Sequence, residues 1–150
     1  MKIGKIPENV LKRSVLRQFH TKRNEVLLGA GVGEDCAGIV LGEDEAFVVS
    51  TDPITGASKN MGELAVIVTV NDLASAGAEP LGIMLTILLP EQSEEKELKV
   101  MVQQVEAECE KFHIQVLGGH TEVTDAVTRP IFSVTGIGKA KKDRLVSTAG

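Results

Sequence analysis

The sequence predicts an α+β domain of two layers, in which a mostly antiparallel sheet of four or more strands carries helices on one face. Three observations support this fold class. Short apolar strand-like segments alternate with single helix-like segments along the chain. The length of 150 residues suits one domain. Hydrophobic residues make up 43% of the chain but include no Trp, no Tyr and only 4 Phe, so the core must be aliphatic.

The first half of the chain predicts a helix, a glycine-rich loop and a hairpin. Apolar residues recur at helical spacing over residues 8–19. Residues 20–35 are predicted as a loop, because they begin with a polar stretch and contain a glycine run at 29–33. Two short apolar strands, residues 36–41 and 45–51, then form a hairpin across a polar turn.

The second half predicts two helices and three strands. Residues 60–77 have the composition of a buried strand in part, but the length of the segment and the closing Gly77 favour a buried helix. An amphipathic helix over residues 94–112 follows, with Ser93 as its candidate N-cap. The three predicted strands are residues 80–89, 114–117 and 130–137.

Composition excludes several classes of protein. A net charge of -5 and the scarcity of aromatic residues argue against nucleic-acid binding. The chain has no apolar run that could cross a bilayer and no signal-peptide pattern, so we expect a cytoplasmic protein without membrane contact. Cys36 and Cys109 are not spaced as a metal pair, and both are more typical of small buried residues.

The end of the sequence predicts a chain cut at a domain boundary. A charged stretch at residues 141–144 follows the last apolar strand, and residues 145–150 then stop without a closing element. A natural frayed terminus is the alternative.

Three aspartates interrupt apolar or glycine-rich context. Asp35 follows the glycine run, Asp52 ends a strand, and Asp72 lies within the apolar segment 60–77. A carboxylate in such a setting is costly unless it is paired or binds a cation. Oxygen ligands suit Mg²⁺, whose remaining positions are commonly filled by substrate phosphates. Each residue alone could cap a turn or lie on a helix surface, but together they predict a magnesium–phosphate site.

Two glycine segments could approach phosphate oxygens. The run at 29–33 lets backbone N–H groups come close to an anion, although it matches neither a Rossmann fingerprint nor a P-loop. The segment 118–122 directly follows an apolar strand, where ligand-facing loops often lie. Within it, His120 suits a phosphate-contacting role better than a metal-ligand role, and Glu122 could supply a further carboxylate. Solvated, flexible loops are the alternative for both segments.

Together these stretches resemble the aminoimidazole ribonucleotide synthase-related (PurM-like) superfamily, which includes thiamine-monophosphate kinase, selenophosphate synthetase and the hydrogenase maturation factor HypE. The opening residues 3–7 and the segment 119–123 are most similar to HypE-related proteins. The stretches that carry the resemblance occur in the family's order over nearly the whole chain, and they are residues 31–37, 50–52, 70–80 and 118–123.

The resemblance implies the superfamily's N-terminal domain, which dimerises through its sheet and binds Mg-ATP near the interface. ATP then activates an acyl or amide acceptor, or gives up its γ-phosphate. On that pattern the metal ligands are Asp35, Asp52 and Asp72, with Glu122 as a possible fourth. The residues implied to contact the nucleotide are Gly31, Gly33, Thr51, Asn71, Gly118, Gly119, His120 and Thr121.

The sequence departs from the family pattern in ways that keep alternatives open. His120 stands where the kinase branch has an acid, and the family's C-terminal domain lies outside residues 1–150. We therefore expect an ATP-dependent parent enzyme, of the synthetase, ligase or phosphotransferase type, whose fragment 1–150 is inactive alone. A non-catalytic dimeric module that binds nucleotide or a partner, and a purely structural domain with a decayed site, are the alternatives.

Overall fold

The computed structural model describes residues 1–34, 36–55 and 59–146. Its strands are β1 (Gly4–Lys5), β2 (Val26–Leu28), β3 (Gly38–Ile39), β4 (Glu45–Ile54), β5 (Glu79–Leu89), β6 (Gln115–Val123) and β7 (Ile131–Lys141). Its α-helices are α1 (Glu8–Val10), α2 (Met61–Ser75) and α3 (Glu95–Phe112). A π turn at Leu11–Val15 and a 3-10 turn at Leu16–Gln18 continue α1, and a last 3-10 turn covers Lys142–Arg144.

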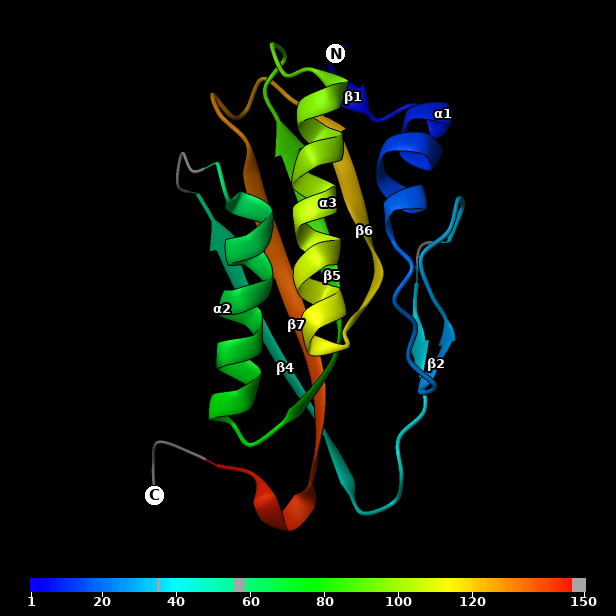
Figure 1. Cartoon of the computed structure of the whole chain (residues 1–150), viewed down its shortest axis with the longest axis vertical. Helices are drawn as coiled ribbons and strands as arrows, with labels where there is room; N and C mark the ends of the chain where they lie inside the picture. The colour runs from blue at the N-terminus through cyan, green and yellow to red at the C-terminus, as the bar shows by residue number, and fades with distance from the viewer. Residues whose placement is uncertain (35, 56–58, 147–150) are drawn as a thin grey trace.

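The α+β class is confirmed. One sheet has the strand order β1-β6-β5-β7-β4, and α2 and α3 lie over one of its faces (Figure 1). Strands β5 and β6 pair in parallel, with α3 as the crossover between them, while the other neighbouring pairs of this sheet are antiparallel. Strands β2 and β3 form a separate ribbon that stands at the β6 side of the sheet (Figure 1).

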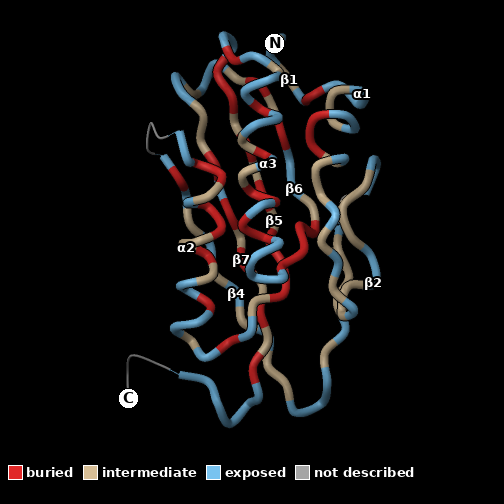
Figure 2. Tube along the Cα trace, in the orientation of Figure 1, coloured by how far each residue is buried: buried red, intermediate tan, exposed pale blue. Residues whose placement is uncertain are grey.

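The core lies between the sheet and its two helices. Every second residue along most of β5 faces the helices and is buried, as the red segments in Figure 2 show. Burial of each aliphatic side chain contributes about 2 kcal/mol. The buried residues of β5 and α3 that share this cluster are Ile83, Leu85, Ile87, Leu89, Leu98, Val102, Val105 and Cys109.

Both long helices are where the sequence predicts them. The predicted helix 60–77 is α2, and Gly77 follows it with a positive φ of 81°, as expected for a helix-ending glycine. The predicted helix 94–112 is α3. Its N-cap is Glu94 and not Ser93, because Glu94 and Glu97 form a reciprocal capping box, while Ser93 is buried.

The predicted hairpin is wrong. Residues 38–39 pair with β2, inside the segment 20–35 that was predicted as a loop. Strand β4 instead pairs with β7 along its whole length, from Glu45 opposite Lys141 to Ile54 opposite Phe132. Strand β4 therefore does not pair with the strand next to it in sequence, because β7 is a longer and more apolar partner than β3.

Several strands are longer than predicted, including β4, which extends beyond residue 51 to Ile54. The predicted strand 114–117 continues to Val123, so the segment 118–122 lies within β6 and not in a loop after it. The last strand runs from Ile131 to Lys141 instead of ending at 137. No helix in the described ranges is long and apolar enough to cross a bilayer.

The sheet face turned away from α2 and α3, here called the outer face, keeps apolar residues on its surface. Phe47 and Val49 of β4 are 50% and 53% exposed. Their cross-strand partners on β7 are Lys139 and Ile137, which share the same face. Within the described residues, no helix covers this side of the sheet (Figure 1).

Candidate functional site

Two of the three predicted aspartates meet at the β4–α2 contact. Asp52 alternates with the exposed residues of β4 and therefore faces the helices, where Asp72 projects from α2. A hydrogen bond with Asp52, assisted by partial desolvation and the charge of Asp52, raises the pKa of Asp72. The third aspartate, Asp35, lies outside the described residues.

This pair fits a divalent cation. Two carboxylates in contact repel each other when both are ionised, and a cation between them removes that repulsion. The donors are oxygen atoms, which suit Mg²⁺. The hydroxyl of Ser50, one step along the same face of β4, is buried and has no hydrogen-bond partner among the described residues.

Thr51 and Asn71 are next to these aspartates in sequence. Thr51 faces the outer side of the sheet, where its hydroxyl accepts a hydrogen bond from that of Thr135 at 3.3 Å. Asn71 is exposed on α2, and its carbonyl oxygen accepts a bond from the Ser75 hydroxyl. The structure therefore turns the Thr51 side chain away from the contact between Asp52 and Asp72.

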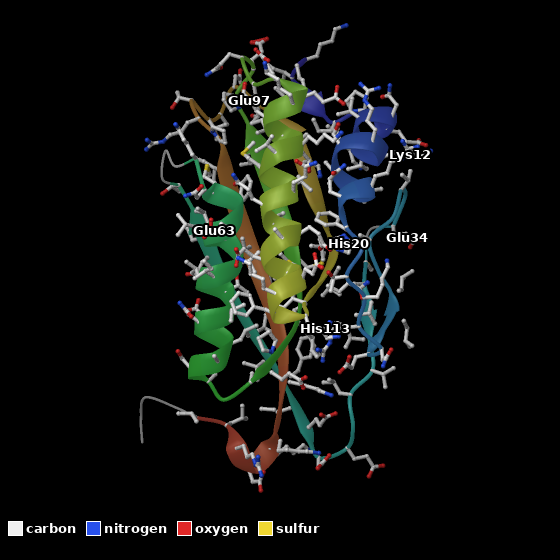
Figure 3. The ribbon with its side chains drawn as sticks, viewed as in Figure 1. Lys12, His20, Glu34, Glu63, Glu97 and His113 are labelled. Carbon is white, nitrogen blue, oxygen red and sulfur yellow. The ribbon has the colours of Figure 1, made fainter. Side chains whose placement is uncertain are left out.

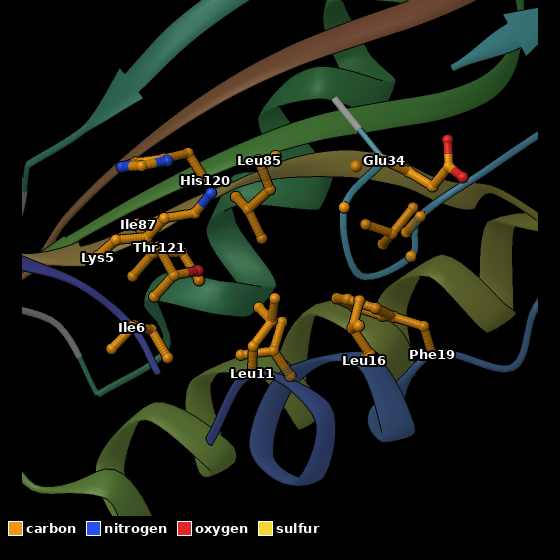
Figure 4. A pocket seen from close by; sticks show the side chains of 17 residues that line it. Lys5, Ile6, Leu11, Leu16, Phe19, Glu34, Leu85, Ile87, His120 and Thr121 are labelled. Carbon is orange, nitrogen blue, oxygen red and sulfur yellow. The ribbon is translucent and has the colours of Figure 1, made fainter. Parts of the chain in front are cut away.

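The glycine residues meet at a different place. A cavity of about 100 Å³ lies between the helical segment after β1, the loop before β3, and strands β5 and β6 (Figure 4). By volume it holds several waters but is smaller than typical ligand pockets, so it can form only part of a nucleotide site. The predicted site residues that line it are Gly31, Gly33, Gly118, Gly119, His120 and Thr121.

The floor of this cavity is apolar. Leu11, Leu16 and Phe19 reach it from the helical segment, opposite Leu85 and Ile87 of β5 (Figure 4). The sequence identified the helical residues as an apolar helix face, but nothing in their spacing distinguishes a cavity wall from ordinary core. Hence this part of the site was missed.

Gly119 is held in a backbone conformation that other residues rarely adopt. Its φ is 154°, and a Cβ at this position would overlap the carbonyl oxygen of Leu85 on the neighbouring strand. Gly118 has no such constraint, since its Cβ would lie 3.4 Å from the flexible end of Met84. The two glycines therefore differ: Gly119 is required for β6 to pass β5, and Gly118 is not.

His120 and Glu122 form a third feature, on the outer face. Their side chains are partly exposed, and His120 Nε2 lies 3.4 Å from Glu122 Oε1. They pair with Thr86 and Leu88 of β5, which alternate with the buried core residues Ile87 and Leu89. Glu122 is therefore separated from Asp52 by two strands and by the sheet itself.

One copy of the chain thus separates the predicted residues. The carboxylate region holds Asp52 and Asp72, and the glycine cavity holds the glycines with Thr121. Glu122 lies on the outer face with His120, which also lines the edge of the cavity. Among the described residues, no group of three or more His, Cys, Asp or Glu side chains could bind a metal ion.

A larger hollow of about 660 Å³ lies elsewhere, between the start of α2 and α3. Its lining includes Met61, Val100, Met101 and Arg129, and none of the predicted site residues. Size alone therefore does not identify the site in this molecule.

Comparisons with known proteins agree on a single family. The AIR synthase related protein N-terminal domain family matches residues 33–140. A candidate hydrogenase expression/formation protein of Methanocaldococcus jannaschii is 29% identical over 147 residues, which are 95% of this chain and 44% of that protein. Carbamoyl dehydratase HypE of Bradyrhizobium diazoefficiens is 32% identical over 89 residues, or 59% of this chain and 25% of that protein.

A solved structure has the same fold. The hydrogenase maturation protein HypE in complex with ATP superposes with a TM-score of 0.81 at 24% identity, covering 96% of this chain and 43% of that chain. The chain spans less than half the length of the relatives and structures it matches. The match over residues 33–140 covers well over half of the 150 residues, so this chain belongs to the AIR synthase related protein family and contains its N-terminal domain.

Proposed function

We propose that this chain is the nucleotide-binding and dimerisation domain of an ATP-dependent protein of the HypE type, and that it binds Mg-ATP through Asp35, Asp52 and Asp72. The contact between Asp52 and Asp72 carries the proposal, because two carboxylates that repel each other when both are ionised gain most from a cation. The ATP complex of the HypE structure with the same fold supports the choice of nucleotide.

Mg²⁺ in such a site neutralises phosphate charge and orients the phosphates. The residues of this chain would then bind and orient the rest of the nucleotide. Backbone N–H groups at Gly31 and Gly33 are free of side-chain bulk and can approach phosphate oxygens. Thr121 and His120 offer further polar contacts from β6, while Thr51, Asn71 and Glu122 complete the set that we assign to the nucleotide and metal.

A second copy of the chain would add residues to the site from the outer face. The outer face exposes Phe47 and Val49 and also carries His120 and Glu122. Pairing of two outer faces buries the apolar residues and places His120 of one copy in a shared interface. We therefore propose a homodimer in which the nucleotide site draws on both chains.

Calorimetric titration with ATP, in the presence and absence of Mg²⁺, tests the nucleotide site. We expect Mg²⁺-dependent binding to the wild-type chain and a loss of at least about tenfold in affinity for Asp52→Asn. Asp143→Asn is the matched control, since Asp143 is an exposed acid in the last 3-10 turn, and it should bind like the wild type. Equal affinity in all three proteins, or no heat at millimolar nucleotide, would overturn the proposal.

Light scattering after gel filtration tests the dimer. Val49→Asp places a charge on the outer face and should give a monomer, whereas Val100→Asp should remain a dimer. Val49 and Val100 are 53% and 51% exposed, so the two changes are matched in exposure and differ in the face they alter. A wild-type chain that is monomeric at micromolar concentration would contradict the proposal.

The acceptor chemistry is the remaining part of the proposal. Relatives include a carbamoyl dehydratase and a thiamine-monophosphate kinase, so an acyl or amide oxygen and a phosphate acceptor are both compatible with the family. A non-catalytic binding module is the second candidate. Binding of Mg-ATP by residues 1–150 with no ADP release would support that candidate.

A further inference from the structure

We propose that a half-buried ion-pair network at the base of the β2–β3 arm positions the glycine loop, with Lys139 as its central positioning residue. The arm is defined as residues 23–34 and 36–40, and its tip carries Gly31 and Gly33. This inference rests on the proposed nucleotide site, because it assigns the network to the loop that lines the glycine cavity.

The arm cannot fix its own position. Its ribbon has only two residue pairs, Val26 with Ile39 and Leu28 with Gly38, joined across the base by the bond from Val40 N–H to the Glu25 carbonyl. A two-stranded ribbon of this size is marginal in water. Leu27, on the ribbon, is 75% exposed, so burial holds it little. Its placement beside β6 must come from contacts at the base.

Arg23 makes the first group of base contacts. Its side chain is only 9% exposed and donates to Glu25 Oε2 at 2.9 Å and to Glu79 Oε1, at the start of β5, at 3.1 Å. A third bond runs to the carbonyl of His113, just after α3, at 3.3 Å. Arg23 therefore ties the entry of the arm to both the sheet and the end of α3.

Lys139 makes the second group. Its ammonium group lies 3.1 Å from Glu25 Oε2 and 3.2 Å from Glu45 Oε2, so it bridges the arm to the start of β4. The side chains of Lys139, Glu25 and Glu45 are 20%, 18% and 14% exposed. Hydrogen bonding with Arg23, assisted by Lys139, holds the pKa of Glu25 at about 2, so this carboxylate stays charged.

Gln115 lies beneath the ribbon and contacts its backbone. Its Oε1 accepts a bond from the backbone N–H of Arg23 at 2.7 Å, and its side chain is buried. A Cβ at Gly29 would lie 2.7 Å from Gln115 Nε2, so the backbone there passes directly over the amide. The same side chain thus contacts the chain on both sides of β2.

The ion-pair network holds the arm, whereas the hydrophobic core holds the sheet and helices. The hydrophobic cluster that stabilises the sheet and helices contains no residue of the arm. Loss of Lys139 leaves Glu25 and Glu45 as half-buried carboxylates in mutual repulsion. That repulsion acts on the arm, which can move away, and not on the packed core. We therefore expect displacement of the glycine loop without global unfolding.

The experiment compares Lys139→Met, Lys139→Arg and Lys141→Met. Lys141 is the matched control, since it lies on the same strand and ion-pairs with Asp44 at 2.8 Å, but both side chains are more than half exposed. A nitroxide label on Cys36 reports arm motion, because Cys36 is exposed and burial raises the pKa of the Cys109 thiol and keeps it unreactive. Unlabelled protein gives the Mg-ATP affinity by calorimetry and the thermal midpoint.

For Lys139→Met we expect a more mobile spin-label spectrum, an affinity for Mg-ATP at least about tenfold weaker, and a thermal midpoint within about 4 °C of the wild type. Lys139→Arg should restore both the spectrum and the affinity, and Lys141→Met should match the wild type. An unchanged spectrum in Lys139→Met, or a mobile arm with unchanged affinity, overturns the positioning role. If the wild type binds no Mg-ATP, the proposed function fails, and the spectra alone decide whether the network fixes the arm.

Discussion

The carboxylate region and the glycine cavity are built from different kinds of structure. Asp52 and Asp72 project from β4 and α2, which are long regular elements packed on the core. Gly31 and Gly33 belong to the tip of an arm that is tied down at its base by polar contacts. The carboxylate region therefore holds its charges in a fixed geometry. In the glycine cavity, the position of the loop backbone depends on the contacts at the base of the arm.

Because of this difference, the geometry of the metal ligands and the position of the phosphate-contacting loop can be changed independently in such a site. A metal ion requires ligands at set distances, which rigid elements provide without further cost at binding. A loop that approaches phosphate must admit the ligand and then close, which a packed core does not permit. Substitutions in the regular strands and helices should accordingly change stability, whereas substitutions at the base of the arm should change loop position.

Gly119→Ala should produce the largest effect on stability. The new methyl group would overlap the Leu85 carbonyl and the residue would need a φ that alanine disfavours, so we expect a loss of about 3 kcal/mol in the free energy of unfolding. Urea denaturation measures it. Gly118→Ala is the control and should cost less than about 1 kcal/mol. Equal losses in both variants would show that the cavity wall adapts more than its geometry indicates.

Asp72→Asn should change the pH dependence of stability. Because the pKa of Asp72 is raised, the wild type gains stability from its protonated form below the ordinary aspartate pKa of about 3.9, and loses it as the pH rises through the folded pKa. The asparagine variant lacks this loss, so its stability relative to wild type should increase over that window. Thermal unfolding at a series of pH values measures the difference, and added Mg²⁺ should reduce it. A pH-independent difference would contradict the interaction with Asp52.

His20→Gln should give the smallest effect, on the segment leading to the arm. His20 Nε2 lies 3.2 Å from Glu110 and Nδ1 lies 3.1 Å from the buried Glu106, beside α3 (Figure 3). The hydrogen bond with Glu110, assisted by the charge of Glu106, raises the pKa of His20.

The stability supplied by protonated His20 is complete below its unfolded pKa of about 6.5 and is lost as the pH rises through the raised folded pKa. Wild type and His20→Gln should therefore differ at pH 6 and converge in alkaline buffer, as thermal midpoints would show. Glu110→Gln should reproduce part of the effect. A difference that persists unchanged at high pH would indicate a role in packing instead of charge.

Much of the fold could be predicted from the sequence, because several signals are local. The length of the segment 60–77 and its closing Gly77 predicted α2, and apolar spacing predicted α3. The pairing of β4 could not be predicted in this way, since its partner begins 77 residues after Ile54, at Ile131. The position of residues 118–122 directly after an apolar segment predicts a loop, whereas the strand continues through them and Gly119 permits it to pass close to its neighbour.

The candidate site was predicted in composition but not in arrangement. The sequence identified Asp52 and Asp72 by their apolar context, and the structure brings them into contact. It could not show that Glu122 lies on the opposite face, because the side of the sheet depends on the register of β6 with β5. Nor could it identify Lys139, an ordinary lysine in a strand, because its role depends on Glu25 and Glu45 from two distant segments.

The pairing of β4 with β7 has a consequence for synthesis of the protein. Strand β4 leaves the ribosome early, while its partner is completed only when Lys141 has been added. At ordinary elongation rates the interval is on the order of ten seconds. During that time Phe47 and Val49 have no neighbouring strand, so the nascent chain exposes an unpaired apolar strand to chaperones before the sheet is complete.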